Sequence, residues 1–220
     1  RIYSACKERI KYLSSQYPIG QSYLCCAIYS VIMSRKIVIF ASGSGSNAEQ
    51  IVQHFESNPS IEVCAFFTNN VKAGVIDRGN RLGIPTVVFN NAALKNGHVL
   101  SALKNFQPDL IVLAGYLKLI PADWIQSFPN KIINIHPALL PKHGGKGMYG
   151  MNVHKAVVES GDTESGITIH YVTEAYDEGA PIFQASVPVE NGDTPERVQA
   201  KVQKLEHEHF PRIVEKLLSE

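Results

Sequence analysis

Residues 131–137 read Lys-Ile-Ile-Asn-Ile-His-Pro, a short apolar run that ends in two polar side chains. The isoleucines predict a buried strand, and the period-two alternation of a strand puts Asn134 and His136 on the same face. Pro137 has no N–H group and cannot continue a central strand, so the chain must leave the sheet there. An amide and an imidazole are therefore presented together at the carboxyl edge of a sheet, where open α/β sheets bind their ligands.

Apolar runs alternate with helix-like segments before this motif. Such an order predicts βαβ units, a parallel sheet and right-handed crossovers. We expect strands at residues 36–40, 61–67, 86–89, 110–114 and 132–135, and helices at residues 48–55, 73–82, 99–106 and 121–128.

The pattern changes after the motif. Residues 167–172 and 182–189 alternate between apolar and polar, which predicts paired strands with one wetter face. A long helix should begin at Thr194-Pro195 and end or kink at Pro211. We therefore predict an α/β fold with a doubly wound, mostly parallel sheet, an antiparallel C-terminal portion and a long C-terminal helix.

Composition excludes several classes of protein. The 220 residues suffice for one domain with a sizeable core, and a net charge of +1 gives no electrostatic case for nucleic acid or a membrane. The cysteines form no C-x-x-C pair and lie near no histidine cluster, so they predict neither a disulfide framework nor a metal site. We expect a reducing compartment, the cytoplasm.

Residues 1–32 differ from the rest of the chain. The apolar run at residues 23–33 is too short to span a bilayer, and Arg35-Lys36 follows it without a small-residue cleavage site. Met33 stands just before the first strand, which favours a natural start there and makes residues 1–32 a non-native or non-catalytic extension. An organelle transit segment and a structural extension are the alternatives. Residues 33–220 are expected to form a single domain.

Two further segments are candidates for a site. Residues 42–47, Ser-Gly-Ser-Gly-Ser-Asn, join the first strand to the first helix, where glycines and a helix N-terminus suit a phosphate. The segment lacks the third glycine of a dinucleotide fingerprint, so an ordinary βα turn is the alternative. Asp177 would favour the charged form of His136 if it lay nearby. Its alternative is a solvated turn residue, and His136 itself could be structural.

Six segments in this order resemble the phosphoribosylglycinamide formyltransferases, over about residues 36–218. The resemblance implies formyl transfer from 10-formyltetrahydrofolate to the amino group of glycinamide ribonucleotide, without a metal. The products would be formylglycinamide ribonucleotide and tetrahydrofolate, in purine synthesis. The segments are residues 42–47, 113–118, 134–142, 166–172, 177–179 and 203–207.

The resemblance also implies roles for individual residues. Asn134 and His136 would stabilise the transition state, with His136 the general acid and Asp177 raising its pKa. Ribonucleotide contacts are expected at Gly45, Ser46, Asn47 and Glu206. Folate contacts are expected at Asn134 and at Leu117, Lys118, Leu119, Ile120, Val172, Thr173, Glu174, Ala175, Tyr176 and, as a further candidate, Lys95.

Departures from the family and rival functions remain. Lys118 stands where many relatives carry arginine, and the glycine-rich residues 144–150 predict a flexible cover. A formyltetrahydrofolate hydrolase and a methionyl-tRNA formyltransferase share the same core but usually carry a further domain. A non-catalytic nucleotide- or folate-binding module is the rival from another class. The expected partners are small-molecule substrates, and the chain would act as a monomer or homodimer.

Overall fold

The computed structural model describes residues 34–219, so the expectations for residues 1–32 lie outside the described part of the chain. Within it, seven strands form one sheet in the order β3-β2-β1-β4-β5-β6-β7. The first five strands run parallel to their neighbours. They are β1 (Arg35–Phe40), β2 (Ile61–Thr68), β3 (Thr86–Val88), β4 (Leu110–Leu113) and β5 (Ile132–His136).

The last two strand pairs are antiparallel, so β6 alone runs against the other six strands. β6 (Glu164–Tyr171) pairs antiparallel with β5, and β7 (Pro181–Pro188) pairs antiparallel with β6. The order moves outward from β1 in both directions, as in a doubly wound sheet, so the predicted sheet and its antiparallel end are confirmed.

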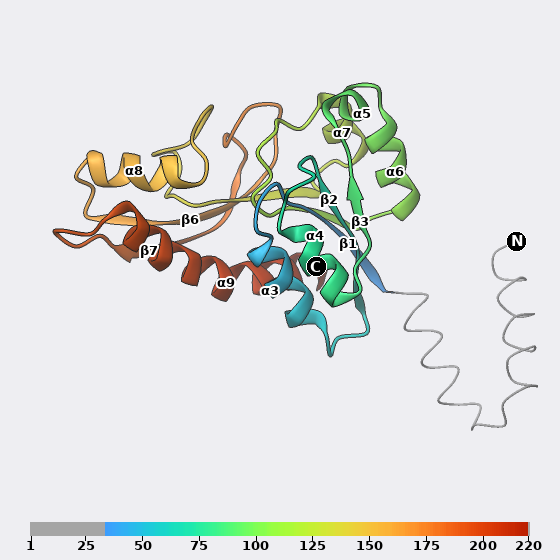
Figure 1. Ribbon diagram of the computed structural model, residues 1–220, viewed down its shortest axis with the longest axis horizontal. Coiled ribbons are helices and arrows are strands. Elements are labelled where there is room, and N and C mark those ends of the chain that lie inside the picture. Colours follow the sequence, from blue (N-terminus) through green and yellow to red (C-terminus); the bar gives the residue numbers. More distant parts are fainter. Residues whose placement is uncertain (1–33, 220) are drawn as a thin grey trace, which may run out of the picture.

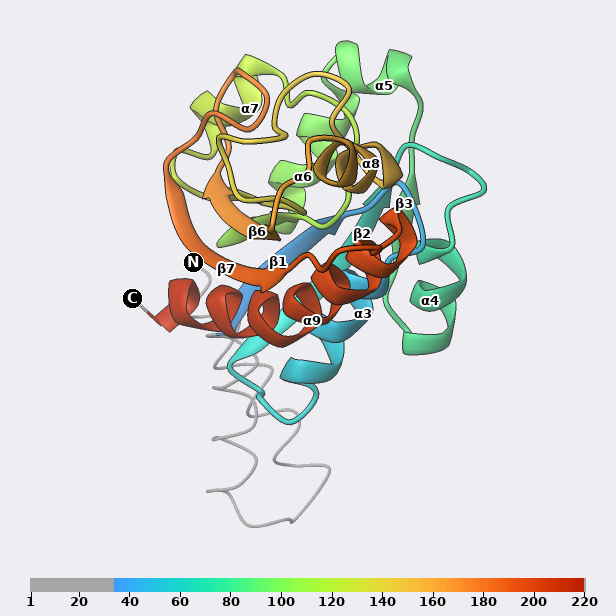
Figure 2. The ribbon, with the colours of Figure 1, turned by 90° about the vertical axis from the view of Figure 1, so that its left-hand side faces the viewer.

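Helices cover both faces of the sheet (Figures 1 and 2). The core on one face includes residues of α3 (Ser46–Phe55), α4 (Val75–Leu82), α8 (Met151–Glu159) and α9 (Pro195–Ser219). The core on the other face receives side chains from α5 (Asn91–Lys95), α6 (His98–Phe106) and α7 (Ala122–Ser127). The alternation of β1 explains both cores: Ile37 and Ile39 enter the first, and Val38 and Phe40 enter the second.

Two local predictions need correction. The C-terminal helix does not end at Pro211, because α9 continues through this residue to Ser219. Proline removes one helical hydrogen bond, but Phe210, Pro211 and Val214 are all buried, and their packing holds the helix together. The short helix α5 was not predicted, since it has no apolar stripe; the side chain of Asn90 caps it by accepting from Ala93 N–H.

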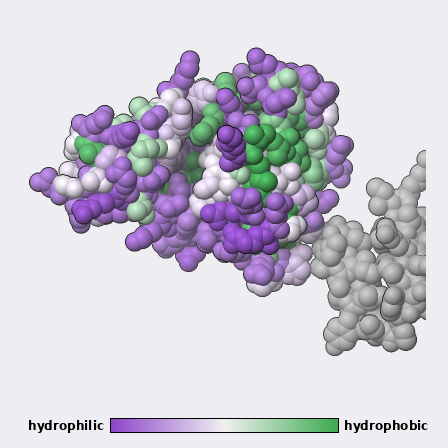
Figure 3. Space-filling view, viewed as in Figure 1, coloured by the Kyte–Doolittle hydropathy of each residue, from purple (hydrophilic) through white to green (hydrophobic). Residues whose placement is uncertain are grey.

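The surface is mixed in character. In Figure 3, apolar residues gather on the half of the view that holds β1 to β3 in Figure 1, and hydrophilic residues cover most of the half that holds α8 and α9. Among the described helices, none combines the length and the apolar character needed to cross a bilayer.

Phe40 should be a main contributor to stability. It is fully buried, and its ring packs against the rings of Phe67, Tyr116 and Trp124 at centroid distances of 4.9 to 5.4 Å. We expect Phe40→Ala to lower the free energy of unfolding by about 3–5 kcal/mol in urea denaturation, because it leaves a cavity in a rigid core. Val71→Ala is the control: Val71 is 74% exposed, and its truncation should change the free energy by less than about 0.5 kcal/mol.

Candidate active site

A cavity of about 770 Å³ opens at the carboxyl ends of β1, β4 and β5. The segments that follow these three strands line it, together with the glycine-rich loop before α8, the loop after β6 and one side of α9. The lining comprises residues 43–47, 113–120, 134–137, 145–150, 172–173 and 175–177, with His154, His170, Gln199, Val202, Gln203 and Glu206.

Asn134 is held by a histidine on the neighbouring strand. The antiparallel register places Asn134 opposite His170, and Asn134 Nδ2 lies 3.1 Å from His170 Nε2. His170 Nδ1 lies 2.8 Å from the carbonyl oxygen of Tyr171, which can only accept, so in the neutral ring Nδ1 donates and Nε2 accepts from the amide. An amide has two N–H donors, so the second N–H of Asn134 is available to a ligand in the cavity.

His136 is oriented by a backbone carbonyl. Its side chain is almost fully buried, and its Nε2 donates to the carbonyl oxygen of His143 at 2.8 Å. In the neutral ring Nδ1 then carries the lone pair, and Nδ1 lies 3.5 Å from Asp177 Oδ1. A proton taken up at Nδ1 would therefore face a carboxylate.

The charge of His136 reflects two opposing influences. Burial lowers the pKa of this histidine, while Asp177 and the His143 carbonyl raise it, and the net pKa is lowered. Asp177 thus acts in the predicted direction, but it does not hold His136 charged in the free protein. The reason is the burial of the ring: His136 is only 3% exposed, and low-dielectric surroundings disfavour the imidazolium.

Asp177 remains ionised beside this ring. Burial raises its pKa, but His170, His136 and the Gly145 N–H together outweigh burial, and the net pKa is lowered. Oδ2 accepts from Gly145 N–H at 2.9 Å, and Oδ1 lies 3.7 Å from His170 Nε2. Asp177 has a φ of 57°, a left-handed conformation that Asp tolerates better than most residues. The carboxylate therefore joins His136 to the glycine-rich loop.

The predicted phosphate segment lines the same cavity. Gly45, Ser46 and Asn47 lie where α3 begins, so unpaired helix N–H groups and the positive end of the helix dipole are at this wall. Asn47 Nδ2 donates to Glu206 Oε2 at 2.8 Å, and Gln203 Nε2 donates to Ser46 Oγ at 3.3 Å. Burial raises the pKa of Glu206, and the Asn47 bond opposes that shift. Helix α9 is thus tied to the start of α3.

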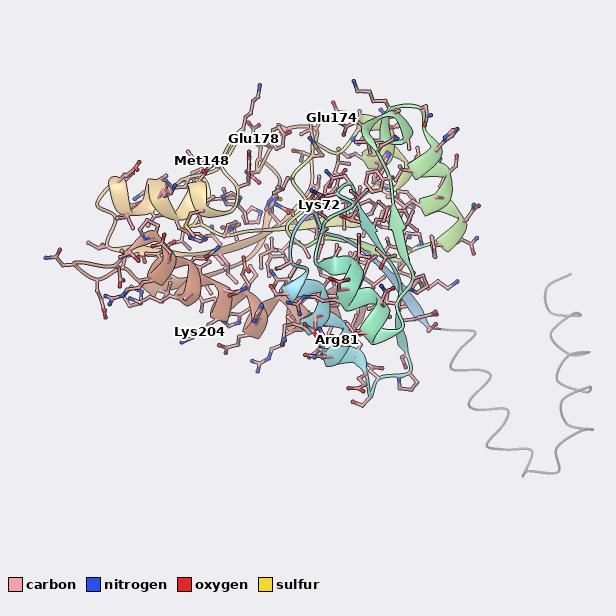
Figure 4. The ribbon with its side chains drawn as sticks, viewed as in Figure 1. Lys72, Arg81, Met148, Glu174, Glu178 and Lys204 are labelled. Atoms are coloured by element: carbon pink, nitrogen blue, oxygen red, sulfur yellow. The ribbon has the colours of Figure 1, made fainter. Side chains whose placement is uncertain are left out.

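Most predicted site residues line this one cavity, but two do not. Glu174 and Lys95 are absent from the lining. Figure 4 places Glu174 on the loop after β6, at the outer margin of the molecule. Lys95 ends α5 and is exposed. The predicted residues that do line the cavity are Gly45, Ser46, Asn47, Glu206, Leu117, Lys118, Leu119, Ile120, Asn134, His136, Val172, Thr173, Ala175, Tyr176 and Asp177.

Sequence reasoning assigned no role to two histidines of the lining. His170 follows the alternation of its strand, so its side could have been predicted, but its partner depends on the register with β5. His154 lies on α8, is 3% exposed and has no hydrogen-bond partner at Nδ1. Burial, with a smaller effect of His136, lowers the pKa of His154 to about 4. Within residues 34–219, no cluster of three or more His, Cys, Asp or Glu side chains is arranged to hold a metal ion.

The sequence of this chain matches the model of a known family. The formyl transferase family model matches residues 35–214. The chain therefore belongs to the formyl transferase family.

Its relatives are phosphoribosylglycinamide formyltransferases. The chain is 41% identical to the chloroplastic enzyme of that name from Arabidopsis thaliana, over 82% of this chain and 64% of the relative. It is 32% identical to the Escherichia coli enzyme, over 81% of this chain and 84% of the relative. The crystal structure of the Brucella melitensis enzyme aligns with a TM-score of 0.76 at 36% identity, covering 85% of this chain and 97% of that one. The chain spans just under two thirds of the length of the two plant relatives it matches.

The buried histidines predict a loss of stability in acid. The pKa of His154 is about 4 in the folded protein, against an ordinary value of 6.5. Between about pH 4 and pH 6.5, the unfolded chain therefore binds a proton at His154, and the folded protein does not. Stability should be complete above about pH 6.5 and fall as the pH drops towards about 4; at about 1.4 kcal/mol per pKa unit, the His154 share is about 3 kcal/mol. The lowered pKa of His136 acts in the same direction.

Urea denaturation between pH 4 and 8 measures this slope. We expect His154→Gln to make the free energy of unfolding less dependent on pH in this window. Asn152→Ala is the control on the same helix: it removes a hydrogen bond to the Gly147 carbonyl but no titrating group, so it should keep the slope. An unchanged slope in His154→Gln would contradict the assignment.

Proposed function

We propose that this protein transfers the formyl group of 10-formyltetrahydrofolate to the amino group of glycinamide ribonucleotide, giving formylglycinamide ribonucleotide and tetrahydrofolate in purine synthesis. The observation that carries the proposal is that Asn134, His136 and Asp177 line one cavity together with two different kinds of surface. The start of α3 offers helix N–H groups, and Leu117, Leu119 and Ile120 offer apolar side chains. The names of the relatives agree with this activity.

The ribonucleotide fits the part of the cavity formed by α3 and α9. Its phosphate would accept from the N–H groups at Gly45, Ser46 and Asn47, which needs no cationic side chain. The carboxylate of Glu206 lies beside Asn47 and can accept from hydroxyl or amide N–H groups of the ligand. These contacts would direct the amino group of the glycinamide towards Asn134.

The folate fits the apolar part of the cavity. Leu117, Leu119 and Ile120 offer apolar walls on one side, and Tyr176 and its neighbours offer them on the other. Leu117 and Leu119 are exposed in the free protein, which suits a surface that a flat ring covers on binding. Lys118 lines the same cavity and can pair with a carboxylate of the folate tail. Its ammonium group acts as a point charge and cannot form the bidentate contact of an arginine.

The chemistry follows from the orientation of the two side chains. The substrate amine attacks the formyl carbon, and the carbonyl oxygen becomes an oxyanion that accepts from the free N–H of Asn134. Neutral His136 takes the proton released by the amine at Nδ1, and Asp177 stabilises the imidazolium that forms. The proton then passes to the folate nitrogen as its bond to the formyl carbon breaks. Atoms and charge balance without a metal or redox group.

The cosubstrate would be 10-formyltetrahydrofolate, and the partners would be these small molecules rather than nucleic acid or a membrane. We propose the cytoplasm as the compartment and a monomer or homodimer as the working unit. The names of two plant relatives place those proteins in the chloroplast.

Product analysis tests the proposed function. Purified protein given both substrates should form formylglycinamide ribonucleotide and tetrahydrofolate in equal amounts. Release of formate without use of the ribonucleotide would instead assign a formyltetrahydrofolate hydrolase. Binding of either ligand with no product from folded protein would indicate a non-catalytic binding module.

Asn134 should act on the transition state. We expect Asn134→Ala to lower kcat by about 10²–10³, because one donor to the oxyanion is lost in a site that excludes water. The dissociation constants of the two ligands, measured by calorimetry, should stay within a few-fold of the wild-type values. Wild-type kcat in this variant would remove Asn134 from the mechanism.

Asp177 should determine the acidic limb of the pH profile. His136 must be neutral to take the proton, so kcat/KM should fall as the pH drops below its pKa. Asp177 raises that pKa, so Asp177→Asn should shift the limb to lower pH and lower kcat by orders of magnitude, since the imidazolium loses its counter-charge. Asp123→Asn, which changes a carboxylate on α7 outside the cavity lining, is the control. A limb that stays in place would contradict the role of Asp177.

A further inference from the structure

Helix α4 packs directly behind the proposed phosphate segment. Val75 N–H donates to the carbonyl oxygen of Gly43 at 3.2 Å, and Arg78 Nε donates to the carbonyl oxygen of Ser44 at 2.7 Å. Both carbonyl groups therefore point towards α4. Arg78 does not line the large cavity but a smaller one behind it, and Ser44 lines both.

These two bonds also orient the N–H groups that follow. In a trans peptide, the C=O of one residue and the N–H of the next point in opposite directions across a rigid plane. A Ser44 carbonyl held on Arg78 therefore aims the Gly45 N–H away from α4, and the Gly43 carbonyl does the same for the Ser44 N–H. Gly45 lines the large cavity, so this is the wall where a phosphate would be bound.

The phosphate segment and the start of α4 are closely packed. Gly45 has a φ of 76°, and a Cβ added there would lie 2.7 Å from Val75 Cβ. A Cβ added at Gly74 would lie 3.2 Å from the carbonyl oxygen of Ser44. The backbones approach each other as closely as glycine allows, so the position of the loop depends on that of α4.

Arg78 is itself held by a buried carboxylate. Glu49 on α3 is only 7% exposed, and its Oε2 pairs with Arg78 Nη1 while its Oε1 pairs with Arg81 Nη2 at 2.6 Å. Arg81 lies at the end of α4 beside α3 (Figure 4). Arg78 uses separate nitrogens for Glu49 and for Ser44, which the planar guanidinium fork permits. Arg81 shares the carboxylate but has no bond to the loop among the described contacts.

We propose that Arg78 is a positioning residue for the phosphate of the ribonucleotide. It acts through the Ser44–Gly45 peptide and does not touch the phosphate. Glu49 fixes the guanidinium, the guanidinium fixes the Ser44 carbonyl, and the carbonyl fixes the direction of the Gly45 N–H. The proposal rests on the proposed ribonucleotide substrate and adds a residue outside the cavity to the determinants of its binding.

Two double variants separate this role from loss of charge and of packing. R78M/E49Q removes the bond to Ser44. R81M/E49Q keeps it, because the amide oxygen that E49Q introduces can still accept from the Arg78 guanidinium and hold it in place. Both remove one arginine and neutralise Glu49, so no buried carboxylate is left half paired, and methionine retains the apolar stem. The readouts are the KM values of both substrates, kcat, and the dissociation constants of ribose 5-phosphate and of ribose.

The expected result is specific to the phosphate. Loss of a charged hydrogen bond should raise the KM of the ribonucleotide and the dissociation constant of ribose 5-phosphate about tenfold in R78M/E49Q, relative to R81M/E49Q. Binding of ribose, the KM of the formyl donor and kcat should differ less than about twofold between the two. Equal KM values for the ribonucleotide in the two variants would overturn the proposal.

Two further outcomes are covered. If R78M/E49Q does not fold, R78K in the native background replaces it, because a lysine ammonium cannot reproduce both bonds of the fork. A several-fold increase in the KM of the ribonucleotide in R78K supports the proposal. An unchanged KM overturns it. The proposed function fails separately, in the wild-type protein, if no formylglycinamide ribonucleotide forms. If the wild-type protein forms the product and the Arg78 variants keep the wild-type KM for the ribonucleotide, only the role of Arg78 is rejected and the proposed function stands.

Discussion

The hydrogen bond from His136 Nε2 to the His143 carbonyl determines how the centre of the site can work. It fixes the plane of the ring and the tautomer, and it leaves Nδ1 as the atom that faces Asp177. The other tautomer would put the single N–H of the neutral ring at Nδ1, against the carboxylate, and would leave no base there. The bond also links the end of β5 to the segment that leads into the glycine-rich loop. Gly145 in that loop donates to the same Asp177, so His136, Asp177 and the loop are held as one unit.

Burial and charge act against each other at this pair, and the balance suits a proton relay. Burial keeps His136 neutral in the free protein, although Asp177 raises its pKa. A histidine that was already charged could not take the proton that the attacking amine must lose. A neutral histidine without a nearby carboxylate would bear the full cost of becoming charged in a buried site. The carboxylate thus contributes most when the imidazolium forms, which is when the reaction needs it.

The sequence predicted those features that follow from short-range patterns. Apolar runs predicted the strands, and the polar residues after β1 and at the end of β5 predicted two parts of the cavity lining, because the carboxyl ends of parallel strands meet at one edge. Features that depend on long-range contacts could not be predicted from the sequence. The charge state of His136 depends on burial, the partner of Asn134 depends on the register between β5 and β6, and the continuation of α9 past Pro211 depends on packing around Phe210. No local pattern contains these contacts.

The same distinction applies to the phosphate segment. Its glycines and its place before α3 are visible in the sequence, but its direction depends on residues about thirty positions away in α4. The backbone N–H groups that we propose as phosphate ligands cannot adjust to a substrate as side chains can, so their peptide planes must be set in advance by other parts of the fold. The short contacts of Gly45 and Gly74 and the fork of Arg78 are the means by which α4 does so. In the arrangement that we propose, the phosphate-binding wall of the cavity is therefore preorganised by residues of α4 that the substrate does not touch.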